Sequence, residues 1–105
     1  MDEAGLRQIA ETATGLDRLV PQIVEGLRSA SEPADFKRLA DLLKPAERFL
    51  IDAGPIMSRT KPEDPALREV VERFMRELPR RLRMIREAQA VLPPLSRDHH
   101  FARAG

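Results

Sequence analysis

Four arginines are the residues in this sequence best placed for binding chemistry. Arg73, Arg76, Arg80 and Arg83 follow one another at steps of three, four and three. Residues at these steps lie on one face of a helix, and such a row can dock an acidic partner or a phosphate backbone. Phe74 lies beside Arg73 in the sequence but belongs to the apolar stripe, so we expect no aromatic residue on the arginine face to stack on bases, and nucleic acid is the less favoured ligand. The alternative is a solvated face stabilised by i, i+4 ion pairs, which would be Glu69–Arg73, Glu72–Arg76 and Glu77–Arg81.

A second candidate surface consists of Ile56 and Met57. Both follow Gly54-Pro55, a pair that is typical of a helix end, so we expect both in a loop. Apolar residues in a loop either cover the end of a core or form a patch for a partner. Together with the four arginines, they are our candidate partner-binding residues.

The sequence offers little for catalysis or metal binding. His99 and His100 follow Asp98 in a terminal segment with no second ligand cluster, so we expect no metal site there. The carboxylates fall at predicted turns and helix faces. There is no cysteine, no glycine-rich phosphate loop and no nucleophile elbow. We therefore predict that the protein is not an enzyme and binds no cofactor or metal.

Composition favours one helical domain. The chain has 105 residues, of which 42% are apolar and 33% charged, with four Phe and no Tyr or Trp. A net charge of +1 gives no overall attraction to nucleic acid or anionic lipid. The sequence shows neither a signal peptide nor an apolar run long enough for a membrane span, so we expect a cytoplasmic location. Fifteen of the 18 basic residues are Arg, which suggests a GC-rich bacterial genome.

Apolar residues recur at alternating steps of three and four in three segments, which predicts three amphipathic helices at about 3–30, 32–53 and 65–92. We expect Ser31 to cap the second helix, and Asp64 followed by Pro65 to start the third. In the third helix the spacing would place Arg81 inside, so we expect the apolar stripe to shift to Leu82. The stripes are Leu6, Ile9, Ala13, Leu16, Val20, Ile23 and Leu27; Phe36, Leu39, Leu43, Ala46, Leu50 and Ala53; and Leu67, Val71, Phe74, Leu78, Leu82, Ile85 and Leu92.

Each predicted helix contains one interior proline: Pro21, Pro45 or Pro79. Because proline lacks an amide hydrogen and crowds the preceding turn, we expect a kink at each. Three stripes at this spacing are hidden by packing the helices together. The sequence thus predicts an all-α fold, an antiparallel three-helix bundle with proline-kinked long helices over residues 1–94, followed by a flexible tail at 95–105.

Two predicted helices each begin with a short sequence motif. One is Ala34-Asp35-Phe36-Lys37-Arg38-Leu39, at the start of the second helix, and the other is Pro65-Ala66-Leu67-Arg68-Glu69-Val70, at the start of the third. Both resemble the small helical chaperones of bacterial flagellar and type III export. A third, Lys61-Pro62-Glu63-Asp64-Pro65-Ala66-Leu67, is similar to the interhelical turn of type III needle subunits. The interior prolines and near-neutral charge depart from the chaperone pattern. The resemblance implies binding of a partner protein and assigns no residue.

We therefore hypothesise a protein–protein interaction module, such as an adaptor or export-type chaperone, that binds a partner helix in a groove. Heptad spacing in all three helices leaves a self-assembling homodimer as the alternative. A small nucleic-acid-associated regulator that uses the arginine row is the third hypothesis.

Overall fold

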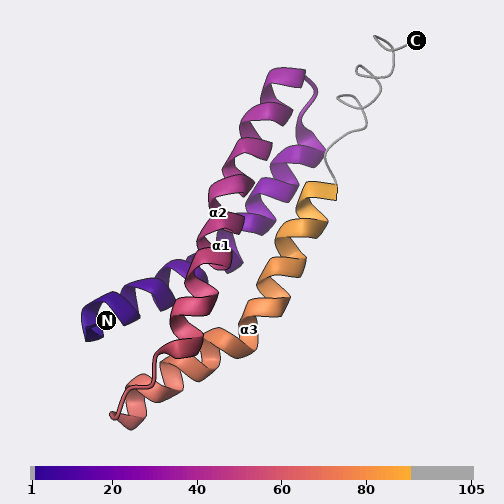
Figure 1. The fold of residues 1–105 in the computed structure, drawn as a ribbon. Coiled ribbons are helices and arrows are strands. Elements are labelled where there is room, and N and C mark those ends of the chain that lie inside the picture. Colours follow the sequence, from indigo (N-terminus) through magenta and orange to yellow (C-terminus); the bar gives the residue numbers. More distant parts are fainter. Residues whose placement is uncertain (1, 91–105) are drawn as a thin grey trace.

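The computed structural model describes residues 2–90 and confirms the predicted three-helix bundle. Its helices are α1 (Glu3–Ser29), α2 (Pro33–Arg59) and α3 (Pro65–Ala90), and no strand occurs in this range. Each helix packs against the other two, and successive helices run in opposite directions (Figure 1). The predicted tail, with His99 and His100, lies outside the described residues.

Two of the helix starts follow from side-chain caps. The Asp2 carboxylate accepts a 2.8 Å hydrogen bond from the Gly5 amide at the start of α1. At the start of α3, the Asp64 carboxylate accepts a 2.9 Å bond from the Ala66 amide, as predicted. The prediction for α2 was wrong. Its N-cap is Glu32, not Ser31, and no side chain caps it, because Pro33 already sets the first helical turn.

The predicted end of α2 was also wrong, because the helix continues through Gly54 and Pro55 to Arg59. Gly54 does not adopt the left-handed conformation of a helix cap. It is instead buried against Leu78 of α3. Met57, one turn further, is fully buried in the core. Burial of these residues outweighs the one backbone hydrogen bond that Pro55 removes.

Prolines are accommodated inside all three helices. Pro21, Pro45, Pro55 and Pro79 are exposed, so their rings do not occupy core space. Figure 1 shows α1 and α3 bending along their length, whereas α2 is straighter. A proline at i leaves the carbonyl at i−4 without its helical partner, which is a common cause of bending.

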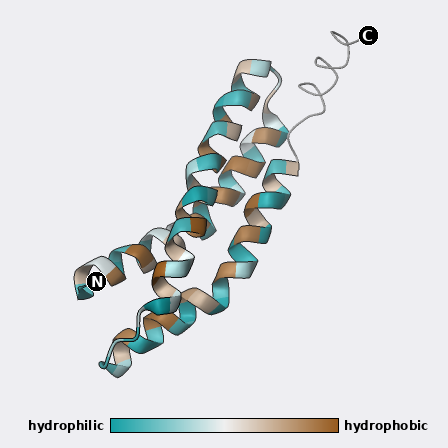
Figure 2. Ribbon diagram, in the orientation of Figure 1, coloured by the Kyte–Doolittle hydropathy of each residue, from teal (hydrophilic) through white to brown (hydrophobic). Residues whose placement is uncertain are grey.

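The core follows the heptad stripes of the three helices. Figure 2 shows hydrophobic and hydrophilic residues alternating along each helix, as expected when one face is buried. The buried apolar residues are Leu6, Ala13, Leu16, Val20, Ile23, Leu27, Leu43, Ala46, Leu50, Ala53, Met57, Val71, Phe74, Ile85 and Ala88.

In α3 the stripe does not shift at Pro79, contrary to the prediction. The heptad spacing continues through Leu78, Arg81, Ile85 and Ala88. Arg81 is the one buried charged residue in the described range, and Leu82 is only half-buried. Sequence reasoning excluded a buried charge, but α1 supplies a carboxylate that compensates it.

Two glycines allow close approach between helices. A Cβ atom at Gly26 of α1 would lie 3.2 Å from Leu39 Cδ1 of α2, and one at Gly54 would lie 3.1 Å from Leu78 Cδ2. These distances are shorter than ordinary van der Waals contact, so both positions favour glycine. None of the helices within residues 2–90 has an apolar stretch long enough to cross a membrane.

Candidate partner-binding site

A buried ion pair joins α1 to α3 in the middle of the bundle. Arg81 Nε donates to Asp17 Oδ1, and Arg81 Nη2 donates to Asp17 Oδ2, both over 3.2 Å. The Arg81 side chain is 6% exposed and that of Asp17 is 30% exposed. This two-point geometry suits the planar guanidinium, and it fixes the relative position of the two helices.

Arg80 and Glu77 extend this pair toward the surface. Arg80 Nη2 donates a 3.2 Å hydrogen bond to Asp17 Oδ1, and Arg80 Nε donates to Glu77 Oε2. The predicted Glu77–Arg81 pair was wrong. Arg81 turns inward to Asp17, and Glu77 instead pairs with Arg80 at the i, i+3 position. These four residues form what we call the α1–α3 charge cluster.

The cluster keeps its acids ionised. Burial raises the pKa of Asp17, but hydrogen bonds and positive charge from Arg81 and Arg80 together bring that pKa below its ordinary value of 3.8. The hydrogen bond from Arg80 lowers the pKa of Glu77, and the same bond raises the pKa of Arg80. The cluster is therefore fully charged at neutral pH.

A groove of about 440 Å³ lies beside this cluster, between the first halves of α1 and α3. Val70, Phe74 and Ala10 give it an apolar floor. Its remaining lining residues are Glu11, Thr14, Gly15, Arg18, Arg73 and Arg81. We call this the α1–α3 groove.

Two arginines on the groove have no ionic partner in the part of the chain that the structure describes. Arg18 and Arg73 are exposed, and neither forms an ion pair within residues 2–90. Arg81 also lines the groove, but Asp17 already compensates its charge. Glu11 is the single acidic residue of the lining. The groove thus combines apolar surface with two available guanidinium groups.

Gly15 leaves space in this groove. A Cβ atom added there would meet no atom within 4 Å, unlike one at Gly26 or Gly54. The glycine is therefore not needed for helix packing. Because Gly15 lines the groove and has no side chain, the groove is wider there than it would be with a larger residue.

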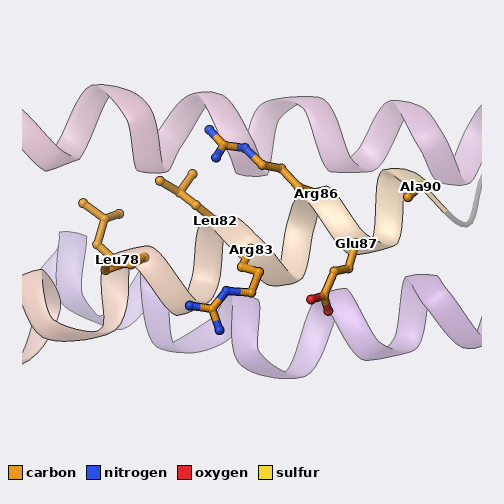
Figure 3. Close-up of a pocket in the computed structure, with 7 residues that line it drawn as sticks. Leu78, Leu82, Arg83, Arg86, Glu87 and Ala90 are labelled. Carbon is orange, nitrogen blue, oxygen red and sulfur yellow. The ribbon is translucent and has the colours of Figure 1, made fainter.

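A second groove, of about 550 Å³, follows the surface of α3 alone. In Figure 3, Leu82 and Arg86 point to one side of α3, and Arg83 and Glu87 point to the other. Arg86 lies 3.9 Å from Glu47 of α2. Because one helix supplies the whole lining, we regard this groove as a weaker candidate than the one between α1 and α3. The lining consists of Leu78, Pro79, Leu82, Arg83, Arg86, Glu87 and Ala90.

The four predicted arginines do not act as one row. Arg73 lines the α1–α3 groove, whereas Arg83 lines the groove on α3. Arg80 belongs to the charge cluster. Arg76 lies 3.9 Å from Glu69, and the predicted Glu69–Arg73 and Glu72–Arg76 pairs do not occur among the ion pairs of residues 2–90.

Ile56 and Met57, the two predicted apolar contact residues, differ in exposure. Ile56 remains 39% exposed on α2, but Met57 is fully buried and is unavailable to a partner. Both lie in the last turns of α2 and not in a loop.

Sequence reasoning missed Asp17, Arg18 and Gly15. The available signal was Asp17, an acid directly beside the α1 stripe, together with Arg81 on the α3 stripe. Pairing these two residues would have placed the neighbouring Arg18 near α3. Gly15 gave no such signal, because a glycine in a helix is equally consistent with close packing.

No metal centre emerges from residues 2–90, which contain no cluster of three or more His, Cys, Asp or Glu side chains placed to hold an ion. No protein-family model matches the sequence, and comparisons with curated proteins and with solved structures find no match.

Proposed function

We propose that this protein is a non-enzymatic protein–protein interaction module whose α1–α3 groove binds an acidic, amphipathic helical segment of a partner. The observation that carries the proposal is a pair of arginines, Arg18 and Arg73, that form no ion pair within residues 2–90 and lie beside an apolar floor. An adaptor, or an export chaperone of the kind that the sequence resembles, would use such a groove to hold its client.

The two parts of the groove have different roles in this proposal. Large apolar side chains of the partner would cover the half-buried Ala10 and Val70 and provide most of the affinity, whereas Phe74 is already buried and adds little surface. Carboxylates beside them would accept hydrogen bonds from Arg18 and Arg73, which favours acidic partners and sets their orientation.

The charge cluster supports this selectivity. Asp17 compensates Arg81, so the buried guanidinium does not need a carboxylate from the partner. The cluster also joins the two helices that form the groove walls, so the walls are in place before binding. A preformed groove reduces the ordering cost of association.

A nucleic-acid ligand fits this arrangement less well. Arg80 is occupied by Asp17 and Glu77, and Arg76 lies near Glu69. The other two arginines of the row, Arg73 and Arg83, line separate grooves, so the row forms no continuous track for a phosphate backbone within residues 2–90.

The proposal can be tested with a fluorescein-labelled helical peptide that carries Leu on one face and Glu beside it. Fluorescence anisotropy should show saturable binding to the protein. The variants Arg18→Glu and Arg73→Glu should each weaken it by about tenfold or more, the loss expected for a charge-assisted contact. Arg28→Glu on α1 is the matched control, because Arg28 is exposed, does not line the groove and, like Arg18 and Arg73, forms no ion pair within residues 2–90.

Gly15→Leu provides an independent test, because the new side chain enters open space and should block the groove while the bundle stays folded. Backbone amide shifts of the labelled protein should report peptide contacts at Val70, Arg73 and Gly15. Equal peptide affinity for the parent protein and Gly15→Leu, with both folded, would exclude the α1–α3 groove as the binding site. Binding of a single-stranded oligonucleotide in place of the acidic peptide would favour the nucleic-acid hypothesis.

A further inference from the structure

The outer surface of α2 carries a line of apolar residues that the bundle does not cover. Leu42 is 45% exposed, Ile56 is 39% exposed, and Phe49 between them is half-buried. Each lies seven residues from the next, so the three share one side of the helix. This line is separate from the α1–α3 groove, to which no residue of α2 contributes.

The neighbouring helix adds to this surface. Leu19 of α1 is 40% exposed, and it lies seven residues before Gly26. Gly26 approaches Leu39 of α2 closely. Since α1 and α2 are antiparallel, moving back along α1 from Gly26 corresponds to moving forward along α2 from Leu39. Leu19 therefore lies beside the middle of α2, on the side where that helix meets α1.

Charged residues accompany the apolar line. Four exposed residues of α2, Asp41, Arg48, Asp52 and Arg59, lie at steps of seven, four and seven, so they share one side of the helix, and they carry the signs minus, plus, minus, plus. The four are symmetrically spaced about residue 50. Asp41 and Arg59 lie nine positions from it (50−41 and 59−50), and Arg48 and Asp52 lie two positions from it (50−48 and 52−50). Read in reverse, these four positions carry the opposite signs. The exposed Lys44 lies between the first two, 3.7 Å from Asp41, and its mirror position, residue 56, carries no charge.

A surface with this symmetry complements a second copy of itself in the antiparallel direction. In a two-fold arrangement the apolar edges of two helices meet each other, and so do the charged edges. Arg48 then faces Asp52 of the second copy, and Asp41 faces Arg59. The apolar edge is centred on residue 49, one position from the centre of the charges, so Leu42 lies opposite Ile56 of the second copy and the two Phe49 side chains meet near the axis.

We propose that the protein forms a symmetric homodimer through antiparallel pairing of α2 with α2 of a second copy. The apolar edge provides the affinity, and the alternating charges select the antiparallel direction. In a single chain Arg48 Nε donates a 3.2 Å hydrogen bond to Asp52 Oδ2, so the dimer would exchange this bond for the same contact between two copies. A parallel pairing would place like charges opposite one another and is disfavoured. The dimer does not depend on the function proposed for the α1–α3 groove.

Sedimentation velocity over a range of concentrations tests the dimer. The expected mass rises from 11.9 kDa at low concentration to twice that value. Arg48→Glu places two acids opposite each other across the interface, and Asp52→Arg places two arginines there. Each single variant should remain a monomer at concentrations where the parent protein is dimeric, with unchanged helical circular dichroism.

Mixing the two monomeric variants provides the decisive comparison. Glu at 48 of one chain would then face Arg at 52 of the other, and Asp52 of the first would face Arg48 of the second. A heterodimer should form in the mixture although neither variant dimerises alone. The double variant Arg48→Glu/Asp52→Arg should dimerise with itself for the same reason. Both results depend on the intermolecular contact, because the folded monomer is the same before and after mixing.

Arg18→Glu and Arg73→Glu in the groove should leave the dimer unchanged, so loss of peptide binding and loss of dimerisation are separable results. Three outcomes would each overturn the dimer. These are a parent protein that stays at 11.9 kDa at millimolar concentration, single variants that dimerise like the parent, and a mixture of variants that stays monomeric.

Discussion

Arg81 donates two hydrogen bonds to the carboxylate of Asp17, although the two residues lie 64 positions apart in the chain. The guanidinium is buried among apolar residues, and the carboxylate lies at the edge of the core. The pair therefore connects α1 to α3 at one defined register. Removing either member would leave the other in surroundings that disfavour an isolated charge.

This arrangement predicts unequal effects of single and double replacement. Asp17→Ala leaves Arg81 buried without its carboxylate and should lower the free energy of unfolding by about 2–3 kcal/mol. That loss is smaller than for a fully enclosed pair, because solvent reaches part of Asp17. Asp17→Leu combined with Arg81→Met should recover most of the loss, since apolar residues of similar volume need no compensation. Urea unfolding followed by circular dichroism measures both. A double variant as unstable as Asp17→Ala would contradict this account.

The Asp17–Arg81 pair also predicts that the free energy of unfolding falls at low pH. In the folded protein the pKa of Asp17 lies below its ordinary value of 3.8. The unfolded chain therefore takes up the proton first as the pH falls. The stabilisation is complete above about pH 5 and is lost as the pH drops through 3.8 to the folded pKa. Urea midpoints at pH 2 to 6 should show this decline. The decline should be smaller in Asp17→Asn, and an identical decline there would assign it to other carboxyl groups.

The three helical glycines should respond differently to alanine. Gly15→Ala adds a methyl group in open space and should raise the free energy of unfolding by about 0.5–1 kcal/mol through helix propensity. Gly26→Ala and Gly54→Ala place the methyl group 3.2 and 3.1 Å from leucine carbons of the neighbouring helix. They should gain less than Gly15→Ala or lose stability. Thermal unfolding of the three matched variants gives the order, and equal gains would mean that the helices do not approach as closely as described.

Met57 and Ile56 test the extension of α2 beyond Pro55. Met57→Ala opens a cavity in the core and should cost about 2–5 kcal/mol of unfolding free energy. Ile56→Ala removes a partly exposed side chain and should cost about 1 kcal/mol or less. Chemical unfolding of both variants decides the matter. Equally small losses of unfolding free energy in the two variants would indicate that both residues lie in a loop, as the sequence predicts.

The sequence was sufficient for the fold class because the heptad stripes of all three segments are regular. The start of α3 was also predictable, since Asp64 and Pro65 act locally through one side chain and one fixed backbone angle. The end of α2 was not predictable from the sequence. Gly54-Pro55 is a strong local stop signal, but burial of Gly54 against Leu78 and of Met57 in the core depends on residues distant in the chain.

The candidate site was less predictable for a related reason. The spacing on α3 identified Arg73 as a possible contact, but whether an arginine is free or paired depends on the helix opposite. Asp17 and Glu77 engage Arg80, and no acid in the described range engages Arg73. A rule that excludes charge from the core also moved the predicted stripe from Arg81 to Leu82. Helix pairing, and not helix propensity, decides each of these cases.

The bundle contains an odd number of antiparallel helices, and so the start of α1 and the end of α3 lie at opposite ends of it (Figure 1). A helix of 27 residues is about 40 Å long at 1.5 Å per residue. Groups fused to the two ends of the described chain are therefore held apart by roughly this distance. In a fusion protein the bundle would act as a stiff spacer and would transmit a pull on one end to the other along α1 and α3.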